Sequence, residues 1–327
     1  MQNLALSCTT FFLCALVLEI ILRFAGYGNL EMYQPDPKLY WKLQPNQDCF
    51  TKIGHHPVHI NSHGARGPEF QVPKPPGTFR ILSLGDSRTF GWGLDEEQTY
   101  SRRLQSLLEQ KAGVTNRIEV INAGVNAWSY SQMFVYFRDT GLSFQPDMVI
   151  VGDANLWTQF TENNRPEFVR QIMWRVRLKD LLRHFAIYDY VVEVKLEKVY
   201  ARARTGFIPV KPGDDRWFPA EQRKDPDAVF YDAVAGICRL AQTNGVKPLL
   251  LYLPWANDLN ATNAPASLRV KQAVHQRLGV PLVDMTPDLR SGGYSLYLEH
   301  DSVHLNAEGN ELVAGRLFET VTNWLPR

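Results

Sequence analysis

Three side chains that lie far apart in the sequence have the types that acyl transfer through a serine requires. Ser87 stands in the tripeptide Gly-Asp-Ser, and Asp301 and His304 lie three residues apart near the end of the chain. A serine hydroxyl is a poor nucleophile until a neighbouring base, most often histidine, takes its proton. A carboxylate can hold such a histidine in the right tautomer. The pattern predicts Ser87 as nucleophile, His304 as base and Asp301 as the group that orients it.

The same chemistry needs hydrogen-bond donors that face the oxyanion of a tetrahedral intermediate. We expect three donors. The backbone N–H of Ser87 lies near the start of a predicted helix, the backbone N–H of Gly124 lies on a turn, and the side-chain amide of Asn155 can donate directly. By itself Gly-Asp-Ser is a weak signal, because it is also typical of a turn before a helix. The elements around these residues therefore have to support the prediction.

From residue 79 onward, short apolar runs alternate with segments of helical length. The predicted strands are Arg80 to Leu84, Ile118 to Ile121, Met148 to Val151, Pro248 to Leu253 and Pro281 to Val283. The predicted helices are Thr99 to Ala112, Ser129 to Thr140, Asp225 to Asn244, Ala264 to Leu278 and Ala307 to Leu325. This alternation predicts an α/β fold with a parallel, doubly wound sheet. Ligands bind beyond the carboxyl ends of such strands, and each candidate residue follows a predicted strand.

The four segments resemble the conserved blocks of the GDSL, or SGNH, hydrolase family. Ser87 matches the nucleophile block, Gly124 in Asn-Ala-Gly-Val-Asn the glycine block, Asn155 the asparagine block, and Asp301-x-x-His304 the last block. The similarity runs from a lead-in at Asn61, which resembles membrane-anchored bacterial members, to Ala314. The resemblance implies a flavodoxin-like three-layer α/β/α sandwich and hydrolysis of acyl or acetyl esters on carbohydrate or lipid, with neither metal nor cofactor.

Two positions depart from the family pattern. The third block usually reads Gly-x-Asn-Asp, whereas this chain has Asp153-Ala154-Asn155-Leu156. Asp153 either lies beside Ser87 and tunes the site or caps a helix. Arg88 replaces an apolar residue directly after the nucleophile. It either pairs with Asp86 or Asp95, or favours an anionic substrate.

Two alternatives to a hydrolase stay open at this stage. An O-acyltransferase would use the same residues, with a sugar hydroxyl in place of water. A non-catalytic envelope protein could retain the hydrolase fold for binding, and the altered third block suggests this second alternative. The near balance of 35 basic and 34 acidic residues argues against a nucleic-acid partner.

Residues Leu4 to Leu22 are almost continuously apolar. Nineteen residues in a helix rise about 28 Å, close to the thickness of the bilayer core. We expect a single membrane-spanning anchor over residues 1–28. A cleaved signal peptide is the alternative, but no Lys or Arg precedes the apolar run. The resemblance implies a periplasmic or otherwise extracytoplasmic domain, although three cations after the span, Arg23, Lys38 and Lys42, weakly favour the opposite orientation.

The remaining sequence divides into two parts. Residues 29–78 are expected to form an extended stalk and lead-in with a short strand near Val58 to Asn61. Residues 79–327 are expected to form the hydrolase domain, interrupted at about 157–226 by a basic helical insertion. That insertion fits either a helix on an anionic membrane surface or a solvated lid helix. Cys49 and Cys238 could pair in an oxidising compartment, and their spacing does not decide it.

Overall fold

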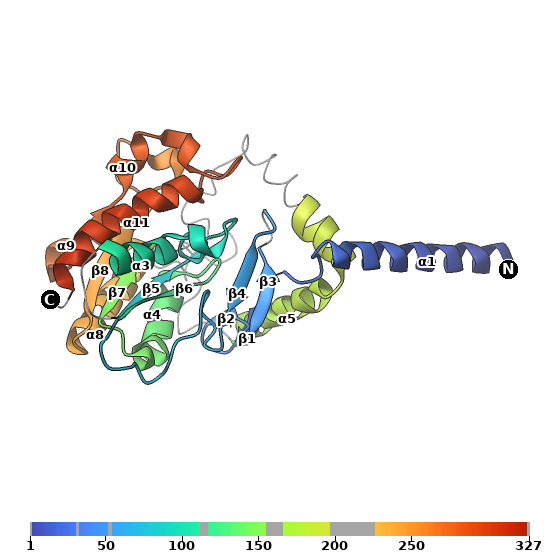
Figure 1. The fold of residues 1–327 in the computed structure, drawn as a ribbon, viewed down its shortest axis with the longest axis horizontal. Helices are drawn as coiled ribbons and strands as arrows, with labels where there is room; N and C mark the ends of the chain where they lie inside the picture. Colours follow the sequence, from blue (N-terminus) through green and yellow to red (C-terminus); the bar gives the residue numbers. More distant parts are fainter. Residues whose placement is uncertain are drawn as a thin grey trace.

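A parallel sheet of five strands forms the centre of the protein in the computed structural model (Figure 1), which describes residues 2–30, 33–51, 54–111, 117–154, 166–196 and 226–325. The strand order is β6-β5-β7-β8-β9. The strands are β5 (Thr78–Gly85), β6 (Arg117–Gly124), β7 (Met148–Val151), β8 (Lys247–Tyr252) and β9 (Leu282–Asp284). The chain adds β6 on one side of β5 and β7 on the other. The strand order therefore reverses at β5, the place where doubly wound sheets bind ligands.

Helices cover both faces of this sheet. One face packs on α3 (Tyr100–Lys111) and α11 (Ala307–Val321), and the other on α4 (Tyr130–Asp139), α8 (Pro226–Thr243) and α9 (Ala266–Leu278). Successive strand residues point to opposite faces. Ile81 accordingly belongs to the core beneath α3 and α11, and Leu82 to the core beneath α4 and α8. The predicted three-layer α/β/α fold is confirmed.

The strands and helices predicted between residues 79 and 325 lie within a few residues of those observed. The strands were recognisable because they are apolar runs buried on both faces, and all eight residues of β5 are buried. Short connecting helices were not foreseen, including α2 (Ser87–Phe90), α10 (Thr286–Arg290) and the 3₁₀ turns η1 (Glu96–Gln98), η2 (Gly141–Phe144), η5 (Ala256–Asp258), η6 (Gly293–Leu296) and η7 (Thr322–Trp324). Single turns carry too little periodicity to be read from sequence.

The segment before the sheet differs from the extended stalk expected of it. It contains two antiparallel hairpins, β1 (Tyr33–Asp36) with β2 (Tyr40–Leu43) and β3 (Gln47–Phe50) with β4 (Pro57–Ile60). Val58 and Ile60 alternate with a polar residue, and both are buried in the main core. The hairpins are therefore packed on the domain. The division at residues 28 and 78 stays a prediction.

The amino-terminal helix α1 (Gln2–Phe24) extends away from the domain, as Figure 1 shows. Residues Asn3–Phe24 are long and apolar enough to cross a membrane. The described part of the insertion consists of α5 (Pro166–Arg183), the single turn α6 (Ala186–Tyr188) and the π-helix η3 (Asp189–Leu196). Cys49 and Cys238 are both buried and both free, so the pairing considered for them is not present.

Candidate active site

The turn that carries Ser87 joins the end of β5 to the first residue of α2. Asp86 caps this helix, because its Oδ1 accepts a hydrogen bond from the Arg88 N–H at 2.9 Å. Gly85 has to be glycine, since an added Cβ would lie 1.9 Å from Thr89 Oγ1. The close contact between strand end and helix leaves Ser87 at the tip of a sharp turn. A sharp turn from a strand into a helix is a common way to expose a nucleophile.

Ser87, His304 and Asp301 form one hydrogen-bonded chain. Ser87 Oγ lies 2.7 Å from His304 Nε2, although 217 residues separate them in sequence. His304 Nδ1 lies 2.6 Å from Asp301 Oδ2. Both distances are within the range in which a base can take a proton from a hydroxyl and be oriented by a carboxylate. The three predicted residues are therefore brought together in the geometry that their predicted roles require.

Backbone groups hold the loop that carries Asp301 and His304. Asp301 Oδ1 accepts hydrogen bonds from the N–H groups of Val303 at 2.7 Å and His304 at 3.1 Å. Burial by itself raises the pKa of the Asp301 carboxyl, but His304 and these two N–H groups outweigh it, and the net pKa is lowered. Asp301 is thus held as a carboxylate that can stabilise a protonated imidazole.

Gly124, predicted as an oxyanion donor, is already engaged. Its N–H donates to Asn122 Oδ1 at 3.0 Å. A Cβ at Gly124 would lie 2.2 Å from the backbone nitrogen of Phe90, so the residue is glycine because α2 packs directly against it. The structure therefore gives Gly124 a packing role and occupies its N–H. Asn155, the other predicted donor after a strand, lies outside the described residues.

Ala127 is a candidate donor that the sequence reasoning missed. It lies in the loop after β6, with φ of 64°, the left-handed region that disfavours side chains. No hydrogen bond from its N–H to a described residue is present. The same loop touches the nucleophile turn, because the Val125 N–H donates to Gly85 O at 3.1 Å. An alanine held in this conformation is a local strain, and such strain gathers at functional sites. Nothing in the sequence marks a positive φ at an alanine.

Arg88 is a buried structural residue and pairs with Asp86, one of the two partners predicted for it. Its Nη2 lies 2.9 Å from Asp86 Oδ2, and its Nε lies 3.1 Å from Asp86 Oδ1. The guanidinium also donates to Leu253 O at 3.1 Å and to Ala154 O at 3.3 Å. Burial by itself lowers the pKa of Arg88, but the carboxylates of Asp86 and Asp153 outweigh this effect, and the net pKa is raised. Because these contacts occupy the guanidinium, it does not reach out toward an anionic substrate.

Asp153, the second departure from the family pattern, belongs to the same buried network. Its side chain is fully buried, and Oδ1 accepts from Lys271 Nζ at 2.5 Å and from the Tyr130 hydroxyl at 3.0 Å. Oδ2 accepts from the Leu253 N–H and lies 3.8 Å from Arg88 Nη1. Asp153 caps no described helix, so the capping role considered for it is not present. Its backbone carbonyl accepts from the Asp86 N–H at 2.9 Å in the turn of Ser87, and its effect on the site stays a prediction.

Lys271 on α9 is the fourth charged member of this network, on the opposite side of Asp153 from Arg88. The side chain is fully buried, and its ammonium also donates to Leu251 O. Burial lowers the pKa of Lys271, and the carboxylate of Asp153 opposes that effect. The two departures from the family pattern are thus parts of one buried cluster. It joins the turn after β5 to the ends of β7 and β8, directly behind Ser87.

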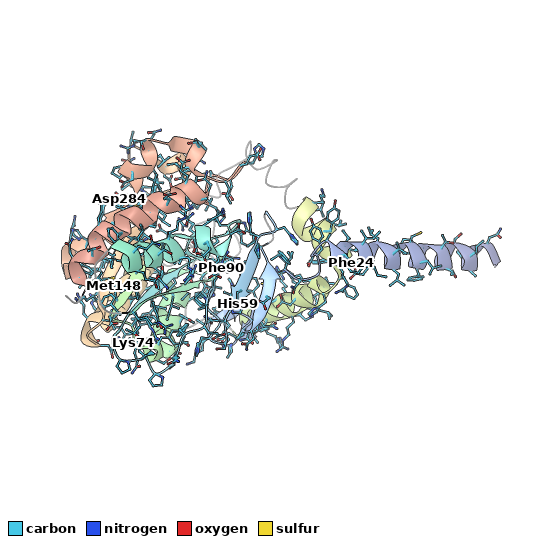
Figure 2. The ribbon with its side chains drawn as sticks, in the orientation of Figure 1. Phe24, His59, Lys74, Phe90, Met148 and Asp284 are labelled. Carbon is cyan, nitrogen blue, oxygen red and sulfur yellow. The ribbon has the colours of Figure 1, made fainter. Side chains whose placement is uncertain are left out.

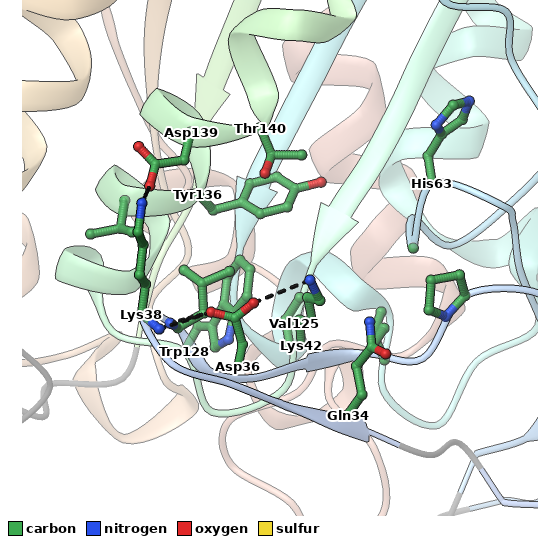
Figure 3. Close-up of a pocket in the computed structure, with 15 residues that line it drawn as sticks. Gln34, Asp36, Lys38, Lys42, His63, Val125, Trp128, Tyr136, Asp139 and Thr140 are labelled. Atoms are coloured by element: carbon green, nitrogen blue, oxygen red, sulfur yellow. Dashed lines mark hydrogen bonds and ion pairs between the residues drawn. The ribbon is translucent and has the colours of Figure 1, made fainter. Parts of the chain in front are cut away.

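A separate cavity of about 230 Å³ lies between the β1–β2 hairpin and α4 (Figure 3). Two ion pairs stand at its wall, Lys38 with Asp139 at 2.6 Å and Lys42 with Asp36 at 3.1 Å. Each lysine is neutralised by its partner. None of Ser87, Asp301 and His304 lines this cavity, so it is distinct from the site built by these residues.

The comparisons with known proteins identify the family of this chain. The sequence model of the GDSL-like lipase/acylhydrolase family matches residues 83–312, which is more than half of the chain. The chain therefore belongs to that family of ester-cleaving hydrolases. The matched range includes every predicted site residue. No match was found among curated protein sequences.

Several solved structures of hydrolases are similar to this chain at low sequence identity. A lipase/acylhydrolase from Enterococcus faecalis is 12% identical with a TM-score of 0.47, and the match covers 76% of this chain and 97% of that one. The esterase EstA from Pseudoalteromonas sp. is 13% identical with a TM-score of 0.46, covering 75% and 97%. An acetyl xylan esterase, AlAXEase, is 19% identical with a TM-score of 0.45, covering 74% and 100%.

Proposed function

We propose that this protein hydrolyses carboxylic esters, acyl or acetyl groups on carbohydrate or lipid, through an acyl-enzyme on Ser87. The observation that carries the proposal is the chain of two short hydrogen bonds from Ser87 Oγ through His304 to Asp301, at 2.7 and 2.6 Å. The family membership supports ester cleavage in general. The roles of these three residues are our assignment.

In the first half of the reaction, Ser87 Oγ attacks the ester carbonyl carbon while its proton passes to His304 Nε2. The carbonyl π electrons move to the oxygen and form an oxyanion. Asp301 faces the other ring nitrogen and stabilises the imidazolium. The intermediate then collapses, the bond to the alcohol oxygen breaks, and His304 returns the proton to that leaving oxygen. The products are a free alcohol and an ester on Ser87.

In the second half, water takes the place of the alcohol. His304 accepts a proton from the water as its oxygen attacks the acyl carbon, and a second oxyanion forms. Collapse breaks the bond to Ser87 Oγ, which regains the proton from His304 Nε2. The acyl group leaves as a carboxylic acid, and the enzyme is restored with atoms and charges balanced.

For the oxyanion we propose the backbone N–H groups of Ser87 and Ala127 together with the Asn155 amide. Ser87 begins α2, so its N–H has no partner within the helix. Ala127 takes the place first predicted for Gly124, whose N–H is occupied by Asn122. Each such donor typically contributes on the order of a hundredfold in rate.

Labelling with a fluorophosphonate probe tests the nucleophile. The full chain in detergent should form a covalent adduct and cleave 4-nitrophenyl acetate, and Ser87→Ala should do neither. Ser83→Ala is a matched control, because this serine lies on β5, just before the turn of Ser87, and its hydroxyl is buried against the Tyr100 hydroxyl. If the wild type takes no label and cleaves no short ester, the third possibility, a non-catalytic envelope protein with this fold, gains support.

The same preparation separates hydrolysis from acyl transfer. Acyl donor is supplied with and without a sugar acceptor, and the products are identified by mass spectrometry. Free acid as the main product in both cases supports the hydrolase. Acylated sugar in preference to free acid would show that a hydroxyl replaces water, which is the acyltransferase alternative.

We further propose that α1 is a retained single-pass anchor and that the catalytic domain is periplasmic or otherwise extracytoplasmic. The length and apolar character of residues Asn3–Phe24 support a membrane span. An alkaline phosphatase fusion after Gly28 should be active when expressed in a Gram-negative bacterium. An inactive phosphatase, together with an active cytoplasmic reporter fused at the same place, would reverse the orientation.

A further inference from the structure

The end of α1 is joined to the insertion through Glu19. Glu19 Oε1 accepts a hydrogen bond from the Ala186 N–H at 3.0 Å, and Oε2 accepts from the Ile187 N–H at 3.1 Å. Arg23, one turn later, donates to Glu19 Oε1 at 2.8 Å and to His184 O. A bare carboxylate in an apolar helix is costly at a membrane, so both of its oxygens need partners. The insertion supplies them.

Two further contacts continue this junction beyond the helix. The Gly28 N–H donates to Asp189 Oδ2 at 2.9 Å, and Asp189 is fully buried. The ring of Tyr27 packs edge-on against Tyr190 at 5.1 Å between centroids. The anchor is therefore docked on α6 and η3 over about two turns. A segment removed by a signal peptidase would take part of this interface with it.

The depth of the junction follows from helix geometry. Glu19 lies five residues before Phe24, the last residue of the candidate span, and at about 1.5 Å per residue this is about 7.5 Å along the axis. Interfacial elements lie about 5–10 Å into the boundary between headgroups and acyl chains. The residues that contact Glu19 and Arg23 therefore lie at the surface of any bilayer that α1 crosses.

Large apolar side chains are exposed around this junction. Phe24 is 90% exposed, Leu181 60%, Phe185 54% and Val191 44%. Phe185 stands between His184 and Ala186, both of which bond to α1. Leu181 lies in the last turn of α5, shortly before Phe185 in the sequence. We name Phe24, Leu181, Phe185 and Val191 the anchor collar.

The catalytic edge of the sheet faces the same end of the molecule. Met148 begins β7, and Figure 2 places it at the end of the domain away from Phe24. Phe90 is the last residue of α2, the helix that Ser87 begins, and it lies nearer to Phe24. The carboxyl ends of parallel strands share one edge. Ser87 therefore lies on the membrane-facing half of the domain, and the junction at Glu19 keeps it there.

We propose that the anchor collar rests in the bilayer surface and holds the active site toward it, so that the enzyme takes an amphiphilic ester whose apolar part stays in the membrane. This inference rests on the proposed function for the substrate, but the contact with lipid stands without it. The occupant of the collar is the lipid bilayer itself. Exposed phenyl and aliphatic side chains around a spanning helix match the apolar boundary that they meet.

Quenching by brominated lipid tests the collar independently of activity. Leu181→Cys and Phe185→Cys are made in the full chain with Cys8 and Cys14 replaced by alanine, labelled with a bimane fluorophore, and placed in vesicles containing dibromo-phosphatidylcholine. Leu312→Cys is the matched control, because Leu312 is exposed and belongs to α11, a helix that Figure 1 shows well away from α1. Quenching at 181 and 185 with none at 312 is expected. Equal quenching at all three positions, or no quenching at 181 and 185, would refute the proposed contact between the anchor collar and lipid.

A comparison of two esters tests the substrate class. The full chain in vesicles is given 4-nitrophenyl acetate in water or 4-methylumbelliferyl palmitate within the bilayer. An uncoupled variant carries Glu19→Ala and ten Gly/Ser residues inserted after Gly26, a linker of about 17 Å root-mean-square length. Its rate on the soluble ester should be unchanged, and its rate on the bilayer ester should fall about tenfold.

The possible outcomes separate the two proposals. If uncoupling leaves the ratio of the two rates unchanged, the membrane-borne substrate is refuted while ester hydrolysis stands. If the wild type cleaves neither ester but the labels at 181 and 185 are quenched, the proposed function fails while the collar stands.

Discussion

Replacing Lys271 by methionine should destabilise the protein strongly, although Lys271 touches no triad residue. Its ammonium is fully buried and donates to Asp153 and to Leu251 O. The buried cluster holds two carboxylates, Asp86 and Asp153, and two cations, Arg88 and Lys271, so its formal charge is zero. The methionine variant leaves one uncompensated negative charge in the core. Breaking a buried pair in this way costs about 3–5 kcal/mol, a large share of the roughly 5–15 kcal/mol that stabilises a typical domain.

The double variant Lys271→Met with Asp153→Asn separates charge from packing. It removes both members of the pair and restores neutrality, so it should recover a substantial part of the loss. Urea unfolding of the full chain in detergent, followed by tryptophan fluorescence, measures both variants. Lys247→Met, an exposed lysine at the start of β8, is the control and should change stability by less than about 0.5 kcal/mol.

Activity gives a second measure of the same network. The backbone carbonyl of Asp153 accepts a hydrogen bond from the Asp86 N–H at 2.9 Å. Arg88, another member of the cluster, directly follows Ser87 in the sequence. Loosening the cluster should therefore lower kcat on a short ester, with little change in KM, in the fraction of Lys271→Met that stays folded. A cost below 1 kcal/mol for Lys271→Met, or a double variant no more stable than the single one, would refute the electrostatic account.

Three further predictions concern the site itself. Asp301→Asn should lower kcat by about four orders of magnitude, because the His304 tautomer is no longer specified, as a 4-nitrophenyl acetate assay would show. The folded-state pKa of Asp301 is lowered, so its ionic stabilisation is present above the ordinary aspartate pKa and is lost as pH falls through the lowered value. The stability gap between wild type and Asp301→Asn should therefore narrow from pH 7 toward pH 3 in urea titrations. Ala127→Gly should raise the unfolding free energy by about 1 kcal/mol and leave kcat similar, since glycine accepts the positive φ.

Much of the fold could be predicted from local pattern alone. Apolar runs such as Met148–Val151 are buried on both faces and stand out against the amphipathic helices between them. Of the four strands in the hairpins before the sheet, only β4 (Pro57–Ile60) corresponds to a predicted strand, the one near Val58 to Asn61. Four-residue strands such as Tyr40–Leu43 were missed because they are too short to give a clear alternation.

The site was predictable where its residue types are chemically distinctive. Ser87, Asp301 and His304 are identified by type and by their places after strands, and the structure puts them in hydrogen-bond contact. Gly124 was predicted as an oxyanion donor from its expected place on a turn and its match to the family's glycine block, and only the three-dimensional structure shows that its N–H donates to Asn122 Oδ1. The backbone conformation of Ala127 leaves no trace in sequence, because φ is set by the loop as a whole.

By itself, the sequence determined the family, the order of the strands and helices, and the identities of the three residues that can activate a hydroxyl. These follow from local periodicity and from side-chain chemistry, both of which can be recognised directly in the amino-acid sequence. The tertiary structure decided what Arg88 and Asp153 do, because the fold determines whether a charged side chain is exposed to solvent or buried against other charged groups. It also decided how the anchor meets the insertion, since the hydrogen bonds of Glu19 reach across 167 residues of sequence.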